Sequence, residues 1–435
     1  MKRLIGIIII ISVALRSSAQ NDSLLQQATL ENIVQYALQH QPLLKQSAID
    51  EEITEQAIKS KLSEWYPQVN LAYNFQHNFQ LQQTVFAGNT VRIGTENTSS
   101  MQLTAMQNIF NRDVLLASRT ADDVRKSIRQ NTAGNKIDVA VTATKAFYDV
   151  LATSQQIKVA AETIIRLERS LKDATAQYTV GVADKTDYKR ATIALNNAKA
   201  SKAANEDLLK AKLEYLKTVI GYPTGNELNI IYDSLAMEKE IYTDTLQTVD
   251  YTKRIEYLQL STQKKLQEAN LKYTRWSYIP SLSAFGAYNL GYQDNSFSKL
   301  YNKSFPNSYA GITLSFPVFQ GFKRTADIKQ AELQVTRVDW DIISLQKNIS
   351  AEYVQALASY KANFENYKAL KENVDLAKEV YDVIQLQYKS GIKTYLEVIT
   401  SETDLRSAQI NYYNALYQVL ASKTDVQKAL GQINY

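Results

Sequence analysis

Apolar and polar side chains alternate strictly along the segment that follows Pro67. Odd positions are mostly apolar or aromatic and even positions mostly amide: Val69, Leu71, Tyr73, Phe75, His77, Phe79 and Leu81 alternate with Asn70, Ala72, Asn74, Gln76, Asn78, Gln80 and Gln82. A period of two is typical of a strand with one apolar and one polar face. Three more segments alternate in the same way, so the sequence predicts strands at about 67–86, 95–110, 280–293 and 308–319.

The four predicted strands form two hairpins. Their connections, at 87–96 and 294–307, are polar and contain Gly88, Gly94 and Pro306. Because these residues usually interrupt regular structure, we expect loops at both places.

Two long runs without proline follow the second and the fourth strand, at 112–178 and 321–388. As helices with a rise of 1.5 Å per residue, each would be about 100 Å long. In the second run apolar residues recur at spacings of three and four, as in coiled coils: Ile328, Ala331, Val335, Val338, Ile342, Leu345 and Ile349. Gly181 and Gly391 then turn the chain into shorter helices, predicted at 182–220 and 392–430.

A proline, a phenylalanine and a glycine recur in the same order and at similar spacing in the two halves of the chain, which indicates an internal repeat. Pro67 matches Pro280, Phe110 matches Phe319 and Gly181 matches Gly391, at separations between 209 and 213 residues. The sequence therefore predicts a first repeat at 20–249 and a second at 250–435. The first would end in a non-helical segment at 221–249, and the second would open with a helix at 250–277 and close with a short tail.

The N-terminus has the pattern of a secretory signal peptide at 1–19. Lys2 and Arg3 precede an apolar core at 4–15, and small residues lead up to a cleavage site after Ala19. A core of about 12 residues is shorter than the roughly 20 that span a bilayer as a helix. Removal of Lys2, Arg3 and Arg16 lowers the formal net charge from +5 to +2, so the mature chain gives no support for nucleic-acid binding.

The residue inventory argues against catalysis and against a bound cofactor or metal. The chain has no cysteine and only two histidines, His40 and His77, and no Gly-rich phosphate loop. Thiolate sites, disulfides and histidine-based catalytic groups therefore have almost no residues to draw on. We expect no enzymatic activity and assign His77 no chemistry.

Strands with one apolar and one polar face suit a membrane barrel, although a soluble sandwich shows the same alternation. Four strands cannot close a barrel, and an open sheet edge is not viable in lipid, so the chain is expected to oligomerise. Eight strands from a dimer would be filled by side chains, whereas twelve from a trimer leave room for a channel. Trp65 and Trp276 each lie just before a strand-opening proline. They would either join an aromatic belt at the membrane surface or simply pack at a helix–strand joint.

Three longer motifs carry a family resemblance. LENIVQYALQHQPLLKQSAIDEEITEQAIKSKLSEWYPQV contains a Gln41-Pro42 joint, and QYTVGVADKTDYKRATIALNNA and QYKSGIKTYLEVITSETDLRSAQ surround the two glycine turns. Together they resemble the opening helix pair and the two periplasmic-tip motifs of the TolC-like outer-membrane efflux factors. The resemblance extends over nearly all of the mature chain.

The resemblance implies an α+β membrane protein in the outer membrane that assembles as a homotrimer. Each chain would supply four strands to a twelve-stranded barrel embedded in lipid, and its long helices would continue the barrel across the periplasm, with a belt built from the 221–249 segment and the tail. Such proteins are passive exit ducts for drugs, small molecules or secreted proteins. They act with a periplasmic adaptor and an inner-membrane pump of the RND or ABC type.

The resemblance also implies roles for residues at the tip. Adaptor contacts would fall on the residues that flank the two glycine turns: Val180, Gly181, Val182, Gly391, Ile392, Lys393 and Thr394. A closed periplasmic gate would use Asp173, Tyr381 and Asp382, of which Asp382 would form an acidic ring in a trimer. A solvated helix face explains any one of these three residues equally well.

One departure from the family pattern concerns a strand-to-helix turn. Family members usually have a glycine pair after the phenylalanine, but the first half reads NIFNRDVLL, whereas the second half keeps Gly321. We therefore expect the turn at 111–113 to differ in geometry from its counterpart. A soluble periplasmic coiled-coil scaffold or adaptor remains the alternative. An uptake porin is disfavoured, because a diffusion pore has no need of helices of about 100 Å.

Overall fold

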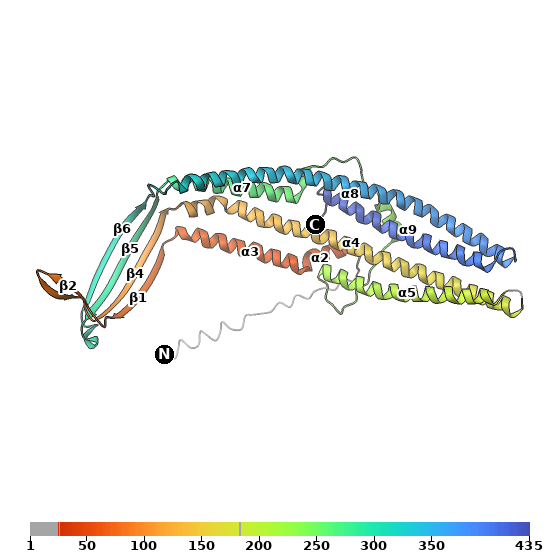
Figure 1. The fold of residues 1–435 in the computed structure, drawn as a ribbon, viewed down its shortest axis with the longest axis horizontal. Helices are drawn as coiled ribbons and strands as arrows, with labels where there is room; N and C mark the ends of the chain where they lie inside the picture. The colour runs from red at the N-terminus through yellow and green to blue at the C-terminus, as the bar shows by residue number, and fades with distance from the viewer. Residues whose placement is uncertain (1–24, 26, 182–183) are drawn as a thin grey trace.

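The protein is long and narrow, with a sheet at one end and two tight helical turns at the other (Figure 1). The computed structural model describes residues 25, 27–181 and 184–435, so the predicted signal peptide lies outside the described residues. Helices α4 (Arg112–Thr179) and α8 (Lys323–Lys389) run from the sheet to the far turns. They have 68 and 67 residues. Neither contains proline, which explains their unbroken length.

Four antiparallel strands form the sheet, in the order β1 (Gln68–His77), β4 (Asn97–Phe110), β5 (Ser281–Asp294) and β6 (Ser304–Ser315). The two hairpins from the two halves of the chain thus lie side by side and are joined by the pairing of β4 with β5. Strands β1 and β6 are the margins of this sheet, and each has one edge that pairs with no other described strand.

The first predicted strand, 67–86, is wrong in its second half. β1 ends at His77, and residues from Gln82 onward form β2 (Gln82–Phe86), which pairs with β3 (Asn89–Ile93) as a separate two-stranded ribbon. The backbone N–H of Asn78 still donates to the carbonyl of Glu96 at 2.7 Å, at the next position of the β1–β4 register, and beyond it the chain leaves the sheet. Ala87 and Gly88 both have positive φ, at 50° and 88°. Positive φ at both positions is typical of a two-residue hairpin turn, so the predicted 87–96 loop is partly a strand.

The predicted strand at about 308–319 is displaced toward the N-terminus. β6 spans Ser304–Ser315 and contains Pro306, which we took as a loop residue, opposite Leu290 of β5. Proline cannot donate a ladder hydrogen bond and is therefore confined to edge strands, and β6 is an edge strand in the protomer.

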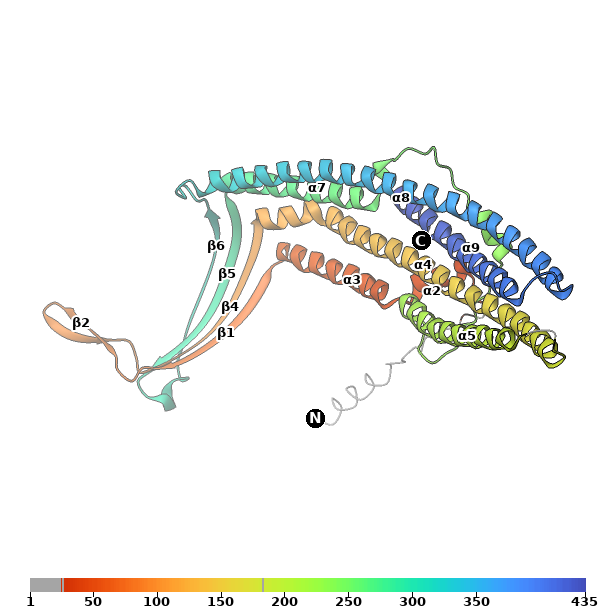
Figure 2. The same ribbon diagram turned by 45° about the vertical axis from the view of Figure 1, so that its right-hand side comes forward.

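Each long helix is flanked by two shorter helices placed end to end (Figure 2). Helices α3 (Pro42–Leu62) and α5 (Lys185–Ile220) lie along α4, while α7 (Ile255–Arg275) and α9 (Tyr395–Ala429) lie along α8. The Gln41-Pro42 joint meets the end of α5, because the side-chain amide of Gln41 donates to the carbonyl of Val219 at 2.9 Å. The repeat in the sequence is therefore also a repeat in the arrangement of the elements.

The largest hydrophobic core lies in the middle of the molecule, where α2 (Leu30–His40) and the ends of the shorter helices meet the long ones. Its fully buried side chains include Ile33, Phe147, Leu151, Leu216, Leu416 and Leu420. We call this region the equatorial core.

The segment between α5 and α7 covers part of the equatorial core and contains only one short α-helix, α6 (Ser234–Glu240). Its backbone carbonyls accept from tyrosines of α8. Tyr353 Oη donates to Gln247 at 2.6 Å and Tyr360 Oη donates to Ile241 at 2.8 Å. These hydrogen bonds satisfy backbone carbonyls that have no partner in a helix or strand. The irregular segment between α5 and α7 can therefore pack on the helices.

Candidate functional site

Two glycine turns form the end of the molecule farthest from the sheet (Figure 2). Gly181 follows α4 with φ of 76°, and Gly391 follows α8 with φ of 75°. This left-handed conformation is easily adopted only by glycine and ends a helix. Beside them, Val180 and Ile392 are 72% and 71% exposed. Of the predicted adaptor contacts, Val182 lies outside the described residues, while the others surround the two turns.

Side-chain caps fix the start of the helix after each turn. Asp184 accepts from the backbone N–H of Thr186 at 2.7 Å at the start of α5. In the second turn Thr394 and Glu397 form a reciprocal capping box, in which Glu397 accepts from the N–H of Thr394 at 2.9 Å. Glu397 also accepts from Nζ of Lys393 at 2.5 Å. This bond and those from Thr394 lower the pKa of Glu397 to about 2.

Two tyrosines join the turn of the first half to the turn of the second. Tyr395 at the start of α9 is buried between α4 and α5, and its phenol oxygen accepts from Oγ of Ser170 at 3.1 Å. Tyr388 of α8 donates to Oε1 of Gln177 at 2.7 Å. Burial, reinforced by the charge of Asp187, raises the pKa of Tyr388 to about 12. This phenol is therefore neutral at physiological pH and can act as a donor.

The three gate candidates have unlike surroundings. Tyr381 is buried, and the guanidinium carbon of Arg166 lies 5.9 Å from the centre of its ring. Burial raises the pKa of Tyr381. Asp382 is exposed and Asp173 is half-buried. Neither carboxylate forms an ion pair with another described residue of the chain. Within one protomer the structure therefore does not bring the three candidates together in one contact.

Arg166 and Glu402 are the tip residues that the sequence did not single out. Nη2 of Arg166 lies 3.3 Å from Oε1 of Glu402, whose side chain is almost fully buried, and 3.0 Å from Oγ1 of Thr163. The Arg166–Glu402 pair links α4 to α9 beside Tyr381. A buried charge is retained only when it is paired and hydrogen-bonded. Nothing local signals this pair, because its members are separated by 236 residues.

Trp65 and Trp276 lie where helix gives way to strand, each in a one-turn 3-10 helix, η2 (Ser63–Trp65) and η4 (Trp276–Tyr278). The guanidinium carbon of Arg119 lies 4.8 Å from the centre of the Trp276 ring. The carbonyl of Trp65 accepts from the amide of Gln107 at 3.4 Å. Both tryptophans therefore lie at the joint, and the ring of Trp276 packs there against Arg119 of α4.

The two strand-to-helix turns differ, as expected from the missing glycine pair. Asn111 caps α4 in an extended conformation and accepts from the N–H of Asp113 at 2.8 Å. In the other half Gly321 and Phe322 have φ of 56° and 66°, and α8 starts without a side-chain cap. A capping asparagine thus replaces the left-handed turn in the first half.

The two faces of the sheet differ in polarity along most of its length. Paired positions put one apolar row across three strands, from Leu71 through Leu103 to Tyr288. The next row on the other face runs from Ala72 through Gln102 to Asn289 and Asn307. We call these the apolar face and the polar face. Leu71 is 65% exposed on the apolar face, so nothing in the protomer covers it.

His77 ends β1 on the apolar face, and its Nδ1 lies 2.7 Å from Oδ1 of Asn97.

Among the described residues no group of His, Asp and Glu has an arrangement that could hold a metal ion. None of the described helices combines the length and the apolarity that a membrane-spanning helix requires.

Comparison with known proteins gives consistent matches. The chain matches the sequence pattern of the family "Outer membrane efflux protein" over residues 33–222 and 258–432. It is 23% identical to the outer membrane protein TolC of Escherichia coli K12, over 100% of this chain and 87% of TolC.

Two solved structures share the fold. The outer membrane protein VceC of Vibrio cholerae is 12% identical with a TM-score of 0.72, over 92% of this chain and 96% of VceC. The CmeC outer membrane channel of Campylobacter jejuni is 15% identical with a TM-score of 0.73, over 93% of this chain and 85% of CmeC. The arrangement of sheet and helices is therefore the one found in these outer-membrane proteins.

Proposed function

Because the chain belongs to the outer membrane efflux protein family, we propose that it is the outer-membrane exit duct of a tripartite export system. In this proposal three copies form a passive channel, with the sheet in the outer membrane and the helices in the periplasm. The chain itself performs no catalysis.

The single observation that carries the proposal is the uncovered sheet with two free margins. Its apolar face is exposed over three strands, and β1 and β6 each keep one unpaired edge. Lipid can cover the apolar face, but it cannot satisfy backbone N–H and C=O groups. Pairing of β1 with β6 of the next copy removes every edge, and twelve strands leave a lumen lined by the polar face.

The outer helices support the same assembly. Ile49 and Ile53 are exposed on α3, and Leu333 and Trp340 are exposed on α8. These helices lie on opposite sides of the protomer, where α3 leads into β1 and α8 follows β6. Apolar side chains in such numbers usually mark an interface. In the proposed trimer α8 of one copy meets α3 of the next.

The tip is the proposed meeting point with the periplasmic adaptor of an RND or ABC-type pump. Val180 and Ile392 are exposed beside the glycine turns and supply apolar contacts. The proposed gate lies just inside this tip and involves Asp173, Tyr381 and Asp382. Three copies of an exposed carboxylate repel one another unless they are bridged. In this proposal, polar and ionic contacts of the gate residues hold the tip closed.

Conductance in planar bilayers tests the duct and its gate together. Purified trimers should give stepwise single-channel currents, and replacing both Asp173 and Asp382 with Ala should raise the conductance of each step because it removes charged contacts at the tip. Glu372→Ala, an exposed carboxylate farther along α8, is the matched control and should leave conductance unchanged.

Two negative results have different meanings. A chain that stays monomeric and never enters liposomes contradicts the duct and supports a soluble periplasmic scaffold or adaptor. A chain that conducts, but whose conductance does not respond to the two aspartates, contradicts only the gate assignment.

A further inference from the structure

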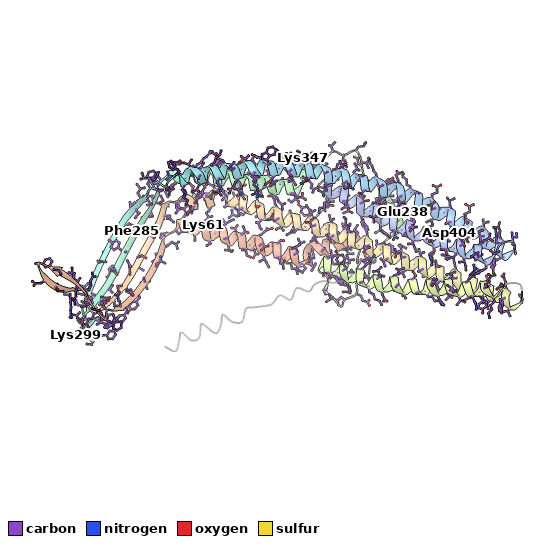
Figure 3. The ribbon with its side chains drawn as sticks, viewed as in Figure 1. Lys61, Glu238, Phe285, Lys299, Lys347 and Asp404 are labelled. Atoms are coloured by element: carbon purple, nitrogen blue, oxygen red, sulfur yellow. The ribbon has the colours of Figure 1, made fainter. Side chains whose placement is uncertain are left out.

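Large aromatic side chains interrupt the polar face near the helical end of the sheet. Phe285 of β5 pairs with Met106 on one side and Gly311 on the other, and Tyr309 belongs to the next row of the same face. Phe285 is marked on β5 in Figure 3. The two rings meet edge to face, with centroids 6.2 Å apart and planes 68° apart. In the protomer Phe285 is 36% exposed and Tyr309 is 52% exposed.

Gly311 leaves the space that the Phe285 ring occupies, because it has no side chain. A Cβ atom on Gly311 would lie 2.7 Å from Cζ of Phe285, too close for any real contact. The ring therefore lies over the backbone of β6 instead of projecting from the sheet. Gly286 is the contrasting glycine, because it lies on the apolar face and a Cβ there would meet nothing closer than 3.9 Å.

Cross-strand packing of an aromatic ring over a glycine stabilises a sheet by itself. Stability alone, however, does not require a second ring beside the first, nor a position on the polar face. We call the exposed pair of Phe285 and Tyr309 the aromatic platform.

No charged side chain belongs to the polar face. The residues of this face are Gln68, Asn70, Ala72, Asn74, Gln76, Thr98, Ser100, Gln102, Thr104, Met106, Asn108, Ser281, Ser283, Phe285, Ala287, Asn289, Gly291, Gln293, Phe305, Asn307, Tyr309, Gly311, Thr313 and Ser315. An aromatic ring is negative over its face and attracts cations there. Another ring of this face, Phe305, already has Nζ of Lys303 5.3 Å from its centre. The platform is therefore the feature of this face best suited to bind a flat, positively charged compound.

We propose that the aromatic platform binds planar organic cations as they pass along the channel wall. The inference rests on the proposed function, since that function puts the polar face in the lumen. A flat cation stacks on the exposed face of the Phe285 ring, and the ring of Tyr309, which lies at a steep angle to it, contacts the side of the cation. Three copies of the chain place three platforms at one level of the barrel.

Current blockade by 9-aminoacridine, a planar monovalent cation, tests the platform. We expect discrete blockades of the open trimer whose mean duration falls about five- to tenfold in Phe285→Leu, which keeps an apolar side chain but removes the ring; one cation–π contact corresponds to roughly that factor.

The two glycines supply a matched pair of variants. Gly311→Ala places a methyl group where the ring lies and displaces Phe285, so it should shorten the blockades. Gly286→Ala should not change them. Each variant is first shown to migrate as the intact trimer.

The results separate this inference from the proposed function. Equal blockade durations in Phe285→Leu and in the unaltered channel overturn the platform while leaving the duct intact. An unaltered chain that never conducts overturns the duct, and the platform with it.

Discussion

The middle of the molecule and its two ends are built in opposite ways. In the equatorial core Phe147 is 0% exposed and is surrounded by other buried side chains of the same chain. At the sheet end Leu71 is 65% exposed, and at the tip Ile392 is 71% exposed. The same kinds of apolar residue are therefore buried in one region and uncovered in the other two.

This difference separates what one copy does alone from what it does with partners. The equatorial core gains its stability inside the protomer, because its apolar side chains are already removed from water. The sheet and the tip leave comparable side chains for lipid, for further copies or for an adaptor. Substitutions in the equatorial core should therefore lower the stability of the folded chain. Substitutions in the sheet and at the tip should instead weaken assembly with other copies or contact with lipid and adaptor.

The largest effect is expected in the equatorial core. Phe147→Ala should lower the free energy of unfolding by about 3–5 kcal/mol, because it removes a fully buried ring and leaves a cavity. Leu71→Ala, on the apolar face of the sheet, is the comparison and should change unfolding in detergent by about 1 kcal/mol or less, since its side chain has few neighbours to lose. Chemical denaturation followed by circular dichroism measures both. Similar losses in the two variants would contradict the division into middle and ends.

A smaller effect is expected for a buried ion pair beside the core. The side chain of Arg254 is 5% exposed, and its two Nη atoms donate to Glu352 at 2.9 Å and to the carbonyl of Ala429 at 3.0 Å. Arg254 also donates to the carboxylate of Glu256, from Nε at 2.9 Å and from Nη2 at 3.0 Å. Arg254→Ala should cost roughly 2–3 kcal/mol, because all three acceptor residues lose a donor that is itself buried.

Lys210→Ala is the matched surface variant, since the Lys210–Asp207 pair is exposed on both sides. It should leave stability nearly unchanged, because water screens an ion pair that is exposed on both sides. The two variants are compared in one set of denaturation curves. A loss for Lys210→Ala as large as that for Arg254→Ala would show that burial does not decide the effect.

The smallest effect is a pH dependence confined to the tip. The pKa of Glu397 is lowered to about 2 by its bonds to Lys393 and Thr394. A lowered pKa means that the carboxylate stabilises the turn above the usual titration range of glutamate, and that this contribution is lost as the pH falls towards 2. The unaltered tip should therefore loosen between about pH 4.5 and pH 2.

The chain has no cysteine, so Ile392→Cys offers a single site for a nitroxide spin label. Label mobility should rise as the pH falls through this range. In the same protein carrying Glu397→Gln it should start higher and stay constant. An identical pH response in both proteins would assign the loosening to some other group.

Local patterns predicted those parts of the fold that depend on local causes. The lack of proline in α4 and α8 and the glycines at 181 and 391 place the long helices and their turns, because helix length and left-handed turns are decided by nearby residues. Likewise the alternation after Pro67 reveals the two faces of the sheet before any neighbour is known.

Contacts between distant residues could not be predicted in the same way. The apolar and polar alternation continues past His77 even though β1 and its pairing with β4 end there. Pro306 was predicted to interrupt a strand, because the sequence around it does not show that β6 is an edge strand, where proline is tolerated. The same limit applies to the candidate site, where Arg166 and Glu402 become partners only through the packing of α4 against α9.

The free edges of β1 and β6 have a consequence for inheritance. If each ring closes through both margins of every member, one defective margin spoils the ring for its intact companions. When a cell makes both a damaged and a sound version of the chain, the damaged version is then expected to be dominant.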